Sequence, residues 1–353
     1  MMRRFQLLVF SVYLLILAFI RLVIPQKWNS ILVIVAGTFL FIISALRSID
    51  FASDTTGYVN KYLSLSYVDF SILLDDLFNG VGKDPFFYLF SKVISIAGFS
   101  YQVWLAVIAS IFCFSISKLI YRYSNEPFIS FVALISLGYF YFSLTGLRQT
   151  MALGCIILSY KYLKERNIIP FVLLVLLGSL FHSSALIFLI SYPVANIKIG
   201  WKQLLGIGAA FIVSLFYSNQ IREIIRVVGW TDSLVAYADQ KTSLSISGFI
   251  IQLSIFLFCL KYKKELLKKD KNNQSLYNLL FLGLIFQAFS TVIAEFFRIS
   301  MYFSIFSIIL IPMSIGVIKD KQIMIIVYLS VFVMLVAYIY WTGSFSGYKF
   351  YWQ

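Results

Sequence analysis

Residues 322–341 read QIMIIVYLSVFVMLVAYIYW, a run of twenty residues without one charged side chain. A helix needs about 20 predominantly apolar residues to cross the hydrocarbon core of a bilayer, so this run predicts a membrane-spanning helix. Other apolar segments follow the same pattern along the chain. They are residues 5–24, 29–46, 101–121, 127–145, 149–163, 168–181, 183–197, 203–218, 246–261, 277–294 and 299–317. Together these segments predict about 12 spanning helices.

The composition agrees with a membrane protein. Hydrophobic residues make up 61% of the chain and charged residues only 12%, whereas a soluble domain carries about 25% charged residues. No interdomain linker or internal repeat is visible between the apolar segments. We therefore expect an all-α fold, a polytopic transmembrane helical bundle of about 12 helices, in which residues 1–353 form a single integral membrane domain.

The formal net charge is +14, which in a soluble protein would suggest a nucleic-acid partner. Here Lys and Arg lie in short loops between apolar segments, as the positive-inside rule expects for cytoplasmic loops. The most basic of these loops spans residues 261–271. We therefore expect no nucleic-acid partner, and we place this loop in the cytoplasm.

Counting helices from that loop predicts which features face the external side. They are the corners at 145–149, 181–183 and 295–298, and a loop near 219–245. A second long loop, near 47–85, carries six aspartates. It is external if the short apolar segment 85–98 does not cross the membrane, and cytoplasmic if it does. We place it outside, because this choice gathers the polar groups on one side.

Arg148 and His182 are ionisable residues at two of these external corners. Such residues are costly near membrane helices and are therefore functional candidates. The guanidinium fork of Arg148 suits phosphate oxygens, although interfacial arginines also snorkel to the headgroups for structural reasons. His182 is a candidate because histidine can take or give a proton near neutral pH, although a lone histidine is more often structural. Ser183 is either its hydrogen-bond partner or the cap of the next helix.

Two further places hold candidate residues. Arg298 is a second phosphate-binding candidate, with Tyr302 one helical turn later, although Arg298 can also pair with the nearby Glu295. Arg47 and Asp54 lie where an apolar segment gives way to the acidic loop. Asp54 is a candidate base or acceptor for sugar hydroxyls, and the alternative is an ordinary solvated loop.

The cysteines and the single histidine argue against a metal site. Cys113, Cys155 and Cys259 all lie inside apolar runs, where cysteine usually behaves as a small hydrophobic residue. The chain has no CxxC or HExxH motif, and no carboxylate cluster converges in the sequence. We expect no metal and no cofactor.

Four motifs, in order, resemble the EpsG family of Wzy-like membrane polysaccharide polymerases. The matching residues are Arg47, Asp54 and Tyr58; Gly146, Leu147, Arg148, Gln149 and Ala152; Phe181, His182, Ser183, Ser184 and Ala185; and Arg298 and Tyr302. The resemblance covers nearly the whole chain, and residues 146–185 are its most specific part. The first motif departs from the family, because Ser53 stands where many members have glycine.

The resemblance implies a multi-pass enzyme of the bacterial cytoplasmic membrane. Such an enzyme is a membrane glycosyltransferase that joins oligosaccharide repeat units carried on undecaprenyl diphosphate, at the outer face of the membrane. The product is capsule, exopolysaccharide or O-antigen. The expected partners are the lipid-linked oligosaccharide, membrane lipid and a protein that regulates chain length.

For glycosyl transfer with diphosphate as the leaving group, we expect Arg148 and Arg298 to hold the diphosphate and His182 or Asp54 to act as the base. Arg47 is a reserve phosphate or glycan contact. We prefer His182, because it shares the external corner layer with the arginines. The remaining candidates, assigned to substrate binding, are Gln149, Tyr58, Tyr302 and Ser183.

Rival functions remain at this stage. A flippase or transporter of lipid-linked oligosaccharide needs a polar path near the membrane midplane, whereas the ionisable residues here lie near the predicted helix ends. A glycan ligase or an acyltransferase is a second alternative, and a non-catalytic scaffold is a third.

Overall fold

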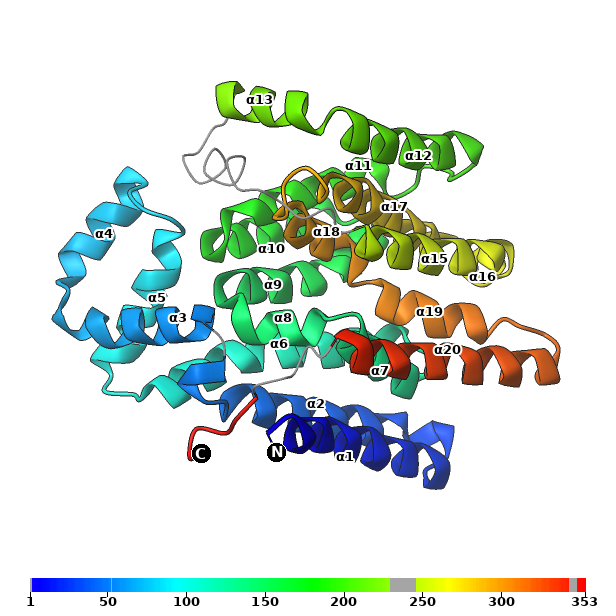
Figure 1. Ribbon diagram of the computed structural model, residues 1–353, viewed down its shortest axis with the longest axis horizontal. Coiled ribbons are helices and arrows are strands. Elements are labelled where there is room, and N and C mark those ends of the chain that lie inside the picture. The colour runs from blue at the N-terminus through cyan, green and yellow to red at the C-terminus, as the bar shows by residue number, and fades with distance from the viewer. Residues whose placement is uncertain (1, 52, 229–245, 343–347) are drawn as a thin grey trace. The chain divides into compact units, whose positions relative to one another are not determined.

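The computed structural model describes residues 2–51, 53–228, 246–342 and 348–353, with the backbone alone for residues 2–10, 26 and 53. Every regular element of more than one residue in these ranges is a helix (Figure 1). The chain divides into two compact units. The first holds residues 1–160, 169–186 and 318–353, and the second holds residues 161–168 and 187–317. The single membrane domain stays a prediction.

The first unit is built mainly from the N-terminal half of the chain and the last long helix. Its helices are α1 (Met2–Val23), α2 (Asn29–Ala45), α3 (Ser53–Ser64), α4 (Phe70–Asn79), α5 (Pro85–Ile96), α6 (Tyr101–Tyr123), α7 (Pro127–Ser136), α8 (Tyr139–Thr145), α9 (Leu147–Lys164), α10 (Ile168–Phe181) and α20 (Lys321–Thr342). Helix α2 packs against α1 and α6, and α20 packs against α7. Proline at the first position starts α5 and α7, where the missing N–H costs no helical hydrogen bond.

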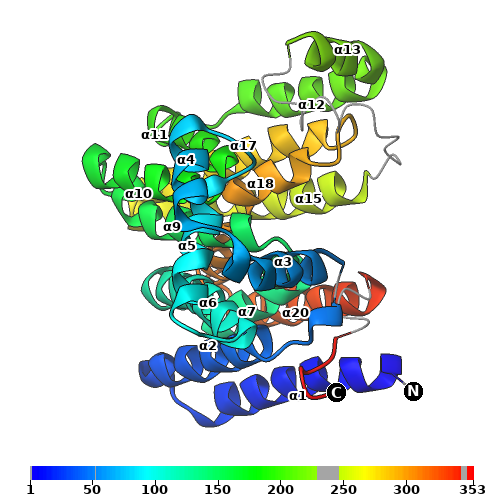
Figure 2. The same ribbon diagram turned by 90° about the vertical axis from the view of Figure 1, so that its left-hand side faces the viewer.

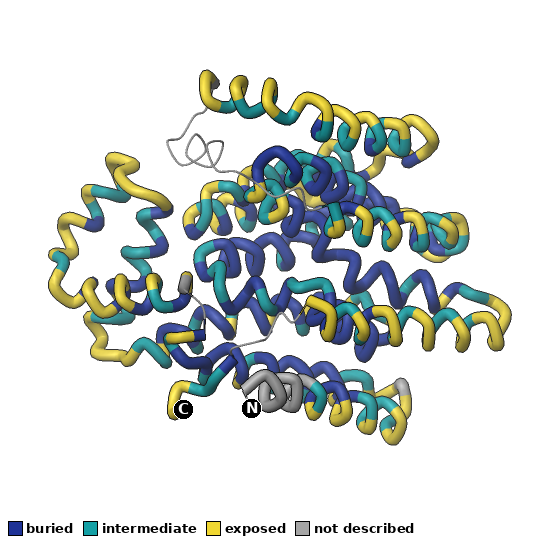
Figure 3. The backbone as a smooth tube through the Cα atoms, viewed as in Figure 1, coloured by how far each residue is buried: buried dark blue, intermediate teal, exposed yellow. Residues whose placement is uncertain are grey.

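The second unit is centred on α17, which packs against α11, α12, α15, α18 and α19. Its helices are α11 (Ser191–Val194), α12 (Trp201–Phe216), α13 (Ser218–Val228), α15 (Ser247–Lys261), α16 (Lys263–Lys269), α17 (Gln274–Phe289), α18 (Phe296–Ser304) and α19 (Ser307–Ile315). A 3-10 helix, η4 (Ser183–Ile190), precedes α11. Most of α17 is buried, as the tube in Figure 3 shows.

Each predicted spanning segment coincides with a helix, a broken pair of helices or, at 183–197, a 3-10 helix followed by α11. The number of spans is not confirmed. Among the described residues, α6 and α20 alone are long and apolar enough to cross a membrane singly. Three bent pairs raise that number to five if each is one span: α7–α8 (54°), α12–α13 (83°) and α18–α19 (43°). The other apolar helices are shorter.

The two stretches expected as long loops contain helices. The stretch 47–85 holds α3 and α4, and α5 packs on both of them (Figures 1 and 2). Gly80 ends α4 in the left-handed conformation, which glycine adopts at low cost. The loop near 219–245 begins inside α13, and its residues 229–245 lie outside the described part of the chain.

Gly178 lets α10 approach α9 closely. A Cβ atom at Gly178 would lie 3.2 Å from the Ala152 carbonyl oxygen and 3.3 Å from Cys155 Cβ. We expect Gly178→Val to lower the stability of the folded protein by about 1–3 kcal/mol, because backbone atoms cannot move aside as a flexible side chain does. Thermal unfolding in detergent measures this loss. Gly206→Val in α12 is the matched control, since a Cβ there meets nothing within 4 Å, and equal losses in both variants would contradict the prediction.

Candidate functional site

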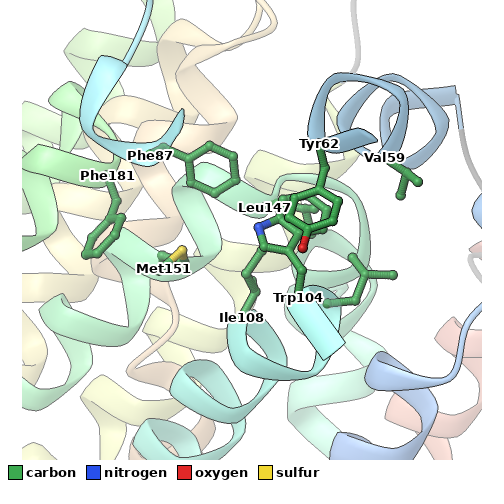
Figure 4. Packing of buried hydrophobic residues seen from close by; sticks show 9 residues of the cluster. Val59, Tyr62, Phe87, Trp104, Ile108, Leu147, Met151 and Phe181 are labelled. Carbon is green, nitrogen blue, oxygen red and sulfur yellow. The ribbon is translucent and has the colours of Figure 1, made fainter. Parts of the chain in front are cut away.

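A cluster of buried apolar side chains joins five helices of the first unit (Figure 4). Val59 comes from α3, Phe87 from α5, Trp104 from α6, Leu147 from α9 and Phe181 from α10. Burial of side chains of this size contributes about 1.5–3 kcal/mol each. The cluster therefore fixes the ends of these helices relative to one another.

Polar candidates lie beside these apolar anchors in the sequence. Tyr58 precedes Val59, Arg148 follows Leu147 and His182 follows Phe181. Asp84 lies three residues before Phe87, at the start of α5. One packing cluster thus brings four polar side chains from four segments into one place.

Asp84 has an unusual backbone conformation. Its φ is 56° and its ψ is 57°, in the left-handed region, and Pro85 follows it directly. This conformation costs about 1–2 kcal/mol for a residue with a side chain. Residues held in such conformations by their surroundings concentrate at functional sites.

The Asp84 carboxylate is the centre of the polar cluster, and its side chain is 1% exposed. Its Oδ2 lies 3.1 Å from Arg148 Nη1 and 2.7 Å from His182 Nδ1. Its Oδ1 accepts a hydrogen bond of 3.1 Å from the Ser183 backbone N–H. The buried carboxylate is therefore compensated by a cation and two further groups, as a buried charge requires.

These contacts hold the pKa of Asp84 below its ordinary value. Burial by itself raises the pKa of this carboxyl, but the hydrogen bond and charge of His182, the Ser183 N–H and the charge of Arg148 together outweigh burial. At neutral pH the group is therefore a carboxylate, which matches the donors that surround it.

We expect Asp84→Asn to lower the free energy of unfolding by about 3 kcal/mol at pH 7, because it leaves the partly buried Arg148 cation without a counter-charge. The folded-state pKa of Asp84 is depressed. Its contribution is therefore fully present above the unfolded-state pKa, near 4, and is lost as the pH falls through the folded-state pKa. Thermal unfolding of wild type and variant from pH 7 down to pH 3 measures the difference. A difference that does not shrink toward pH 3 would contradict this account.

Arg148 lies in the first turn of α9 and is held on several sides. Its Nη1 also donates to the Lys83 carbonyl oxygen at 3.0 Å, and its Nε donates to the Tyr58 hydroxyl at 3.1 Å. The guanidinium carbon lies 5.7 Å from the centre of the Tyr58 ring, within the range of a cation–π contact. Its Nη2 has no hydrogen-bond partner among the described residues, so one end of a positioned cation stays available to a ligand.

His182 directly follows the last residue of α10, and its side chain is 16% exposed. When Nδ1 donates its proton to Asp84 Oδ2, the other ring nitrogen, Nε2, carries a lone pair and can accept a proton. No hydrogen bond to Nε2 is formed by any described residue. The arrangement is a carboxylate–imidazole pair whose second ring nitrogen is not used by any described residue.

The other predicted site residues lie elsewhere or act differently. Ser183 contributes its backbone N–H, and Gln149 is buried in α9. Asp54 is exposed in the first turn of α3 and forms no ion pair or hydrogen bond with a described residue. Arg47 is buried after the end of α2, and no hydrogen bond or ion pair joins it to Asp84.

Arg298 and Tyr302 belong to the second unit, on α18. Arg298 is partly buried, and Tyr302 is fully buried. Their assignment to diphosphate and substrate binding stays a prediction. Within the described residues, no group of three or more His, Cys, Asp or Glu side chains converges as a metal site.

Sequence reasoning missed Asp84. It counted this residue only as one of six aspartates in the stretch 47–85. Asp84 is the one among them that is followed by proline and an apolar helix, in Asp84-Pro85-Phe86-Phe87. That local signal marks a helix start, but the partners of the carboxylate lie far along the chain.

Comparison with known proteins supplies a family. The model of the EpsG family matches residues 30–353, a range that includes every predicted site residue. Neither the search of curated proteins nor the search of solved structures found a match.

Proposed function

The chain belongs to the EpsG family, and from this premise we propose that it is a Wzy-like polysaccharide polymerase. It joins oligosaccharide repeat units carried on undecaprenyl diphosphate into capsule, exopolysaccharide or O-antigen. It lies in the bacterial cytoplasmic membrane, crosses it several times and acts at the outer face. A protein that regulates chain length is a further proposed partner.

The observation that carries the proposal is the cluster of Asp84, Arg148 and His182. It combines a positioned cation with a basic imidazole nitrogen, the two groups that glycosyl transfer from a diphosphate requires. Both Arg148 and His182 have side chains that are 16% exposed. A substrate can therefore reach them while Asp84 stays buried beneath.

The proposed step moves one glycan between two lipid carriers. The acceptor hydroxyl gives its proton to His182 Nε2 as its oxygen bonds to the anomeric carbon of the donor sugar. The bond from that carbon to the diphosphate oxygen breaks, and the electron pair leaves with the diphosphate. Asp84 holds the imidazole in the required tautomer and stabilises the imidazolium that forms, as the carboxylate of a catalytic triad does.

Arg148 stabilises the leaving group in this proposal. As the bond to the sugar breaks, negative charge grows on the diphosphate, and a cation already fixed in place interacts with it without reorganising. The contacts to Tyr58, Asp84 and the Lys83 carbonyl fix the guanidinium before substrate arrives. In this proposal its Nη2 binds the diphosphate oxygens.

The location of the cluster favours an enzyme over a flippase. Asp84 precedes α5, Arg148 lies in the first turn of α9 and His182 follows α10, so the cluster gathers helix ends. A transporter needs ionisable groups along a path near the membrane midplane. A glycan ligase uses the same donor chemistry and remains the alternative, distinguished by its acceptor.

The deciding experiment is polymerisation in vitro by the purified protein with its lipid-linked repeat unit. A ladder of longer glycans on the lipid carrier supports the polymerase. Transfer of a single unit to a different acceptor, with no ladder, identifies a ligase. Movement of the intact substrate across liposomes without a ladder identifies a flippase.

A further inference from the structure

Arg47 is a buried guanidinium that leaves the three N–H donors of Nε and Nη2 unused by the described residues. It is 1% exposed, and its Nη1 donates to the Ser44 carbonyl oxygen and lies 3.4 Å from Ser44 Oγ. That contact caps the end of α2, a structural role that one N–H group performs. Its Nε and Nη2 are buried without a hydrogen-bond partner among the described residues.

The two unpartnered nitrogens form one edge of the guanidinium. Nε–H and Nη2–H point the same way and match two oxygens of a carboxylate or a phosphate. Arg21 uses the same pair in this protein: its Nε donates to Glu126 Oε1 at 2.7 Å and its Nη2 donates to Glu126 Oε2 at 2.8 Å. No carboxylate of a described residue pairs with this edge of Arg47.

An uncompensated buried cation is costly. Burial lowers the pKa of the Arg47 guanidinium to about 10, and among the described residues Tyr348 acts against burial. The group is still charged at neutral pH. A buried cation with two free parallel donors is complementary to an oxyanion.

The C-terminal segment, residues 348–353, packs against Arg47 and the end of α2. The Tyr348 hydroxyl donates to the Ile43 carbonyl oxygen at 2.8 Å, and Arg47 forms an isolated antiparallel bridge with Phe350. Two backbone hydrogen bonds flank that bridge: the Ser48 N–H donates to the Lys349 oxygen, and the Tyr351 N–H donates to the Leu46 oxygen. These few hydrogen bonds hold the C-terminal segment against residues 43–48.

We propose that Arg47 is a bidentate oxyanion-binding site closed by the C-terminal segment, separate from the Asp84 cluster. The ligand presents two adjacent oxygens, as a diphosphate or the carboxylate of an acidic sugar does. It enters when residues 348–353 move away from residues 46–48. That the oxyanion belongs to the lipid-linked substrate rests on the proposed function, whereas the binding of a free oxyanion does not.

The test is equilibrium binding of pyrophosphate and of glucuronate to the purified full chain in detergent. Arg47→Lys keeps a charge and a donor for Ser44 but loses the paired edge, and we expect it to weaken binding at least about tenfold, the loss of a charge-assisted hydrogen bond. Arg21→Lys is the matched control and leaves binding unchanged. In an Arg148→Lys background the binding that depends on Arg47 persists.

The outcomes distinguish the two possible ligands, and they distinguish failure of this proposal from failure of the proposed function. Stronger binding of pyrophosphate identifies a diphosphate ligand, and stronger binding of glucuronate identifies an acidic sugar. Equal binding by wild type and Arg47→Lys, or loss of all binding in Arg148→Lys, overturns the proposal. Absence of a glycan ladder with oxyanion binding intact overturns the proposed function alone.

A second variant tests whether the C-terminal segment closes the Arg47 site, even if Arg47→Lys does not fold. Tyr348→Phe removes the hydrogen bond to the Ile43 carbonyl and leaves Arg47 in place. We expect pyrophosphate to associate severalfold faster with this variant than with wild type. The association is measured by the fluorescence of Trp352, whose ring stacks on Phe350 with the ring centroids 4.6 Å apart. An association rate equal to that of wild type overturns the proposal.

Discussion

Arg148→Ala is expected to lower the rate of glycan polymerisation by about 100-fold or more, the usual cost of removing one preorganised donor from developing negative charge. Arg148→Lys keeps the charge but loses the fork that contacts Tyr58, Asp84 and the Lys83 carbonyl. We expect it to recover only a small part of the lost rate, since lysine does not replace arginine at a forked site.

The measurement is the rate of ladder formation from the lipid-linked repeat unit, with the folded fraction of each variant determined alongside. Arg21→Lys is the control, because Arg21 pairs with Glu126 away from the Asp84 cluster. A rate within twofold of wild type for folded Arg148→Ala would exclude this arginine from the reaction.

His182→Ala is expected to lower the polymerisation rate by about 10²–10⁴-fold, the range for loss of a general base. Asp84→Asn acts through the imidazole, and we expect a loss of similar size, because an amide at this place stabilises neither the required tautomer nor the imidazolium. Asp84→Glu keeps a carboxylate and is expected to restore part of the rate.

The rescue by Asp84→Glu and the pH–rate profile distinguish a positioning role of Asp84 from a merely structural one. A positioning carboxylate predicts that Asp84→Asn changes the shape of the pH–rate profile as well as its height. Asp69→Asn is the control, since Asp69 is exposed at the start of α4 and its side chain forms no capping hydrogen bond. If Asp54→Asn abolishes activity and His182→Ala does not, the base is Asp54.

The helices and the family were predictable from the sequence. Apolar runs such as 101–121 and 322–341 coincide with α6 and α20, because helix formation depends on residues three to four positions apart. The motif around Arg148 and His182 pointed to the EpsG family, which the family model confirms. The number of membrane-crossing helices was not settled, because several apolar helices are bent or short.

The sequence by itself determined an all-helical chain, its family and the apolar anchors, such as Leu147 and Phe181, that stand beside the polar candidates. Only the tertiary structure decided which polar groups meet. His182 and Asp84 are 98 positions apart, and no local pattern links them. Their hydrogen bond exists because the packing of apolar side chains on α3, α5, α9 and α10 brings distant helix ends together. Likewise, no local pattern links Arg47 to the C-terminal segment that packs against it.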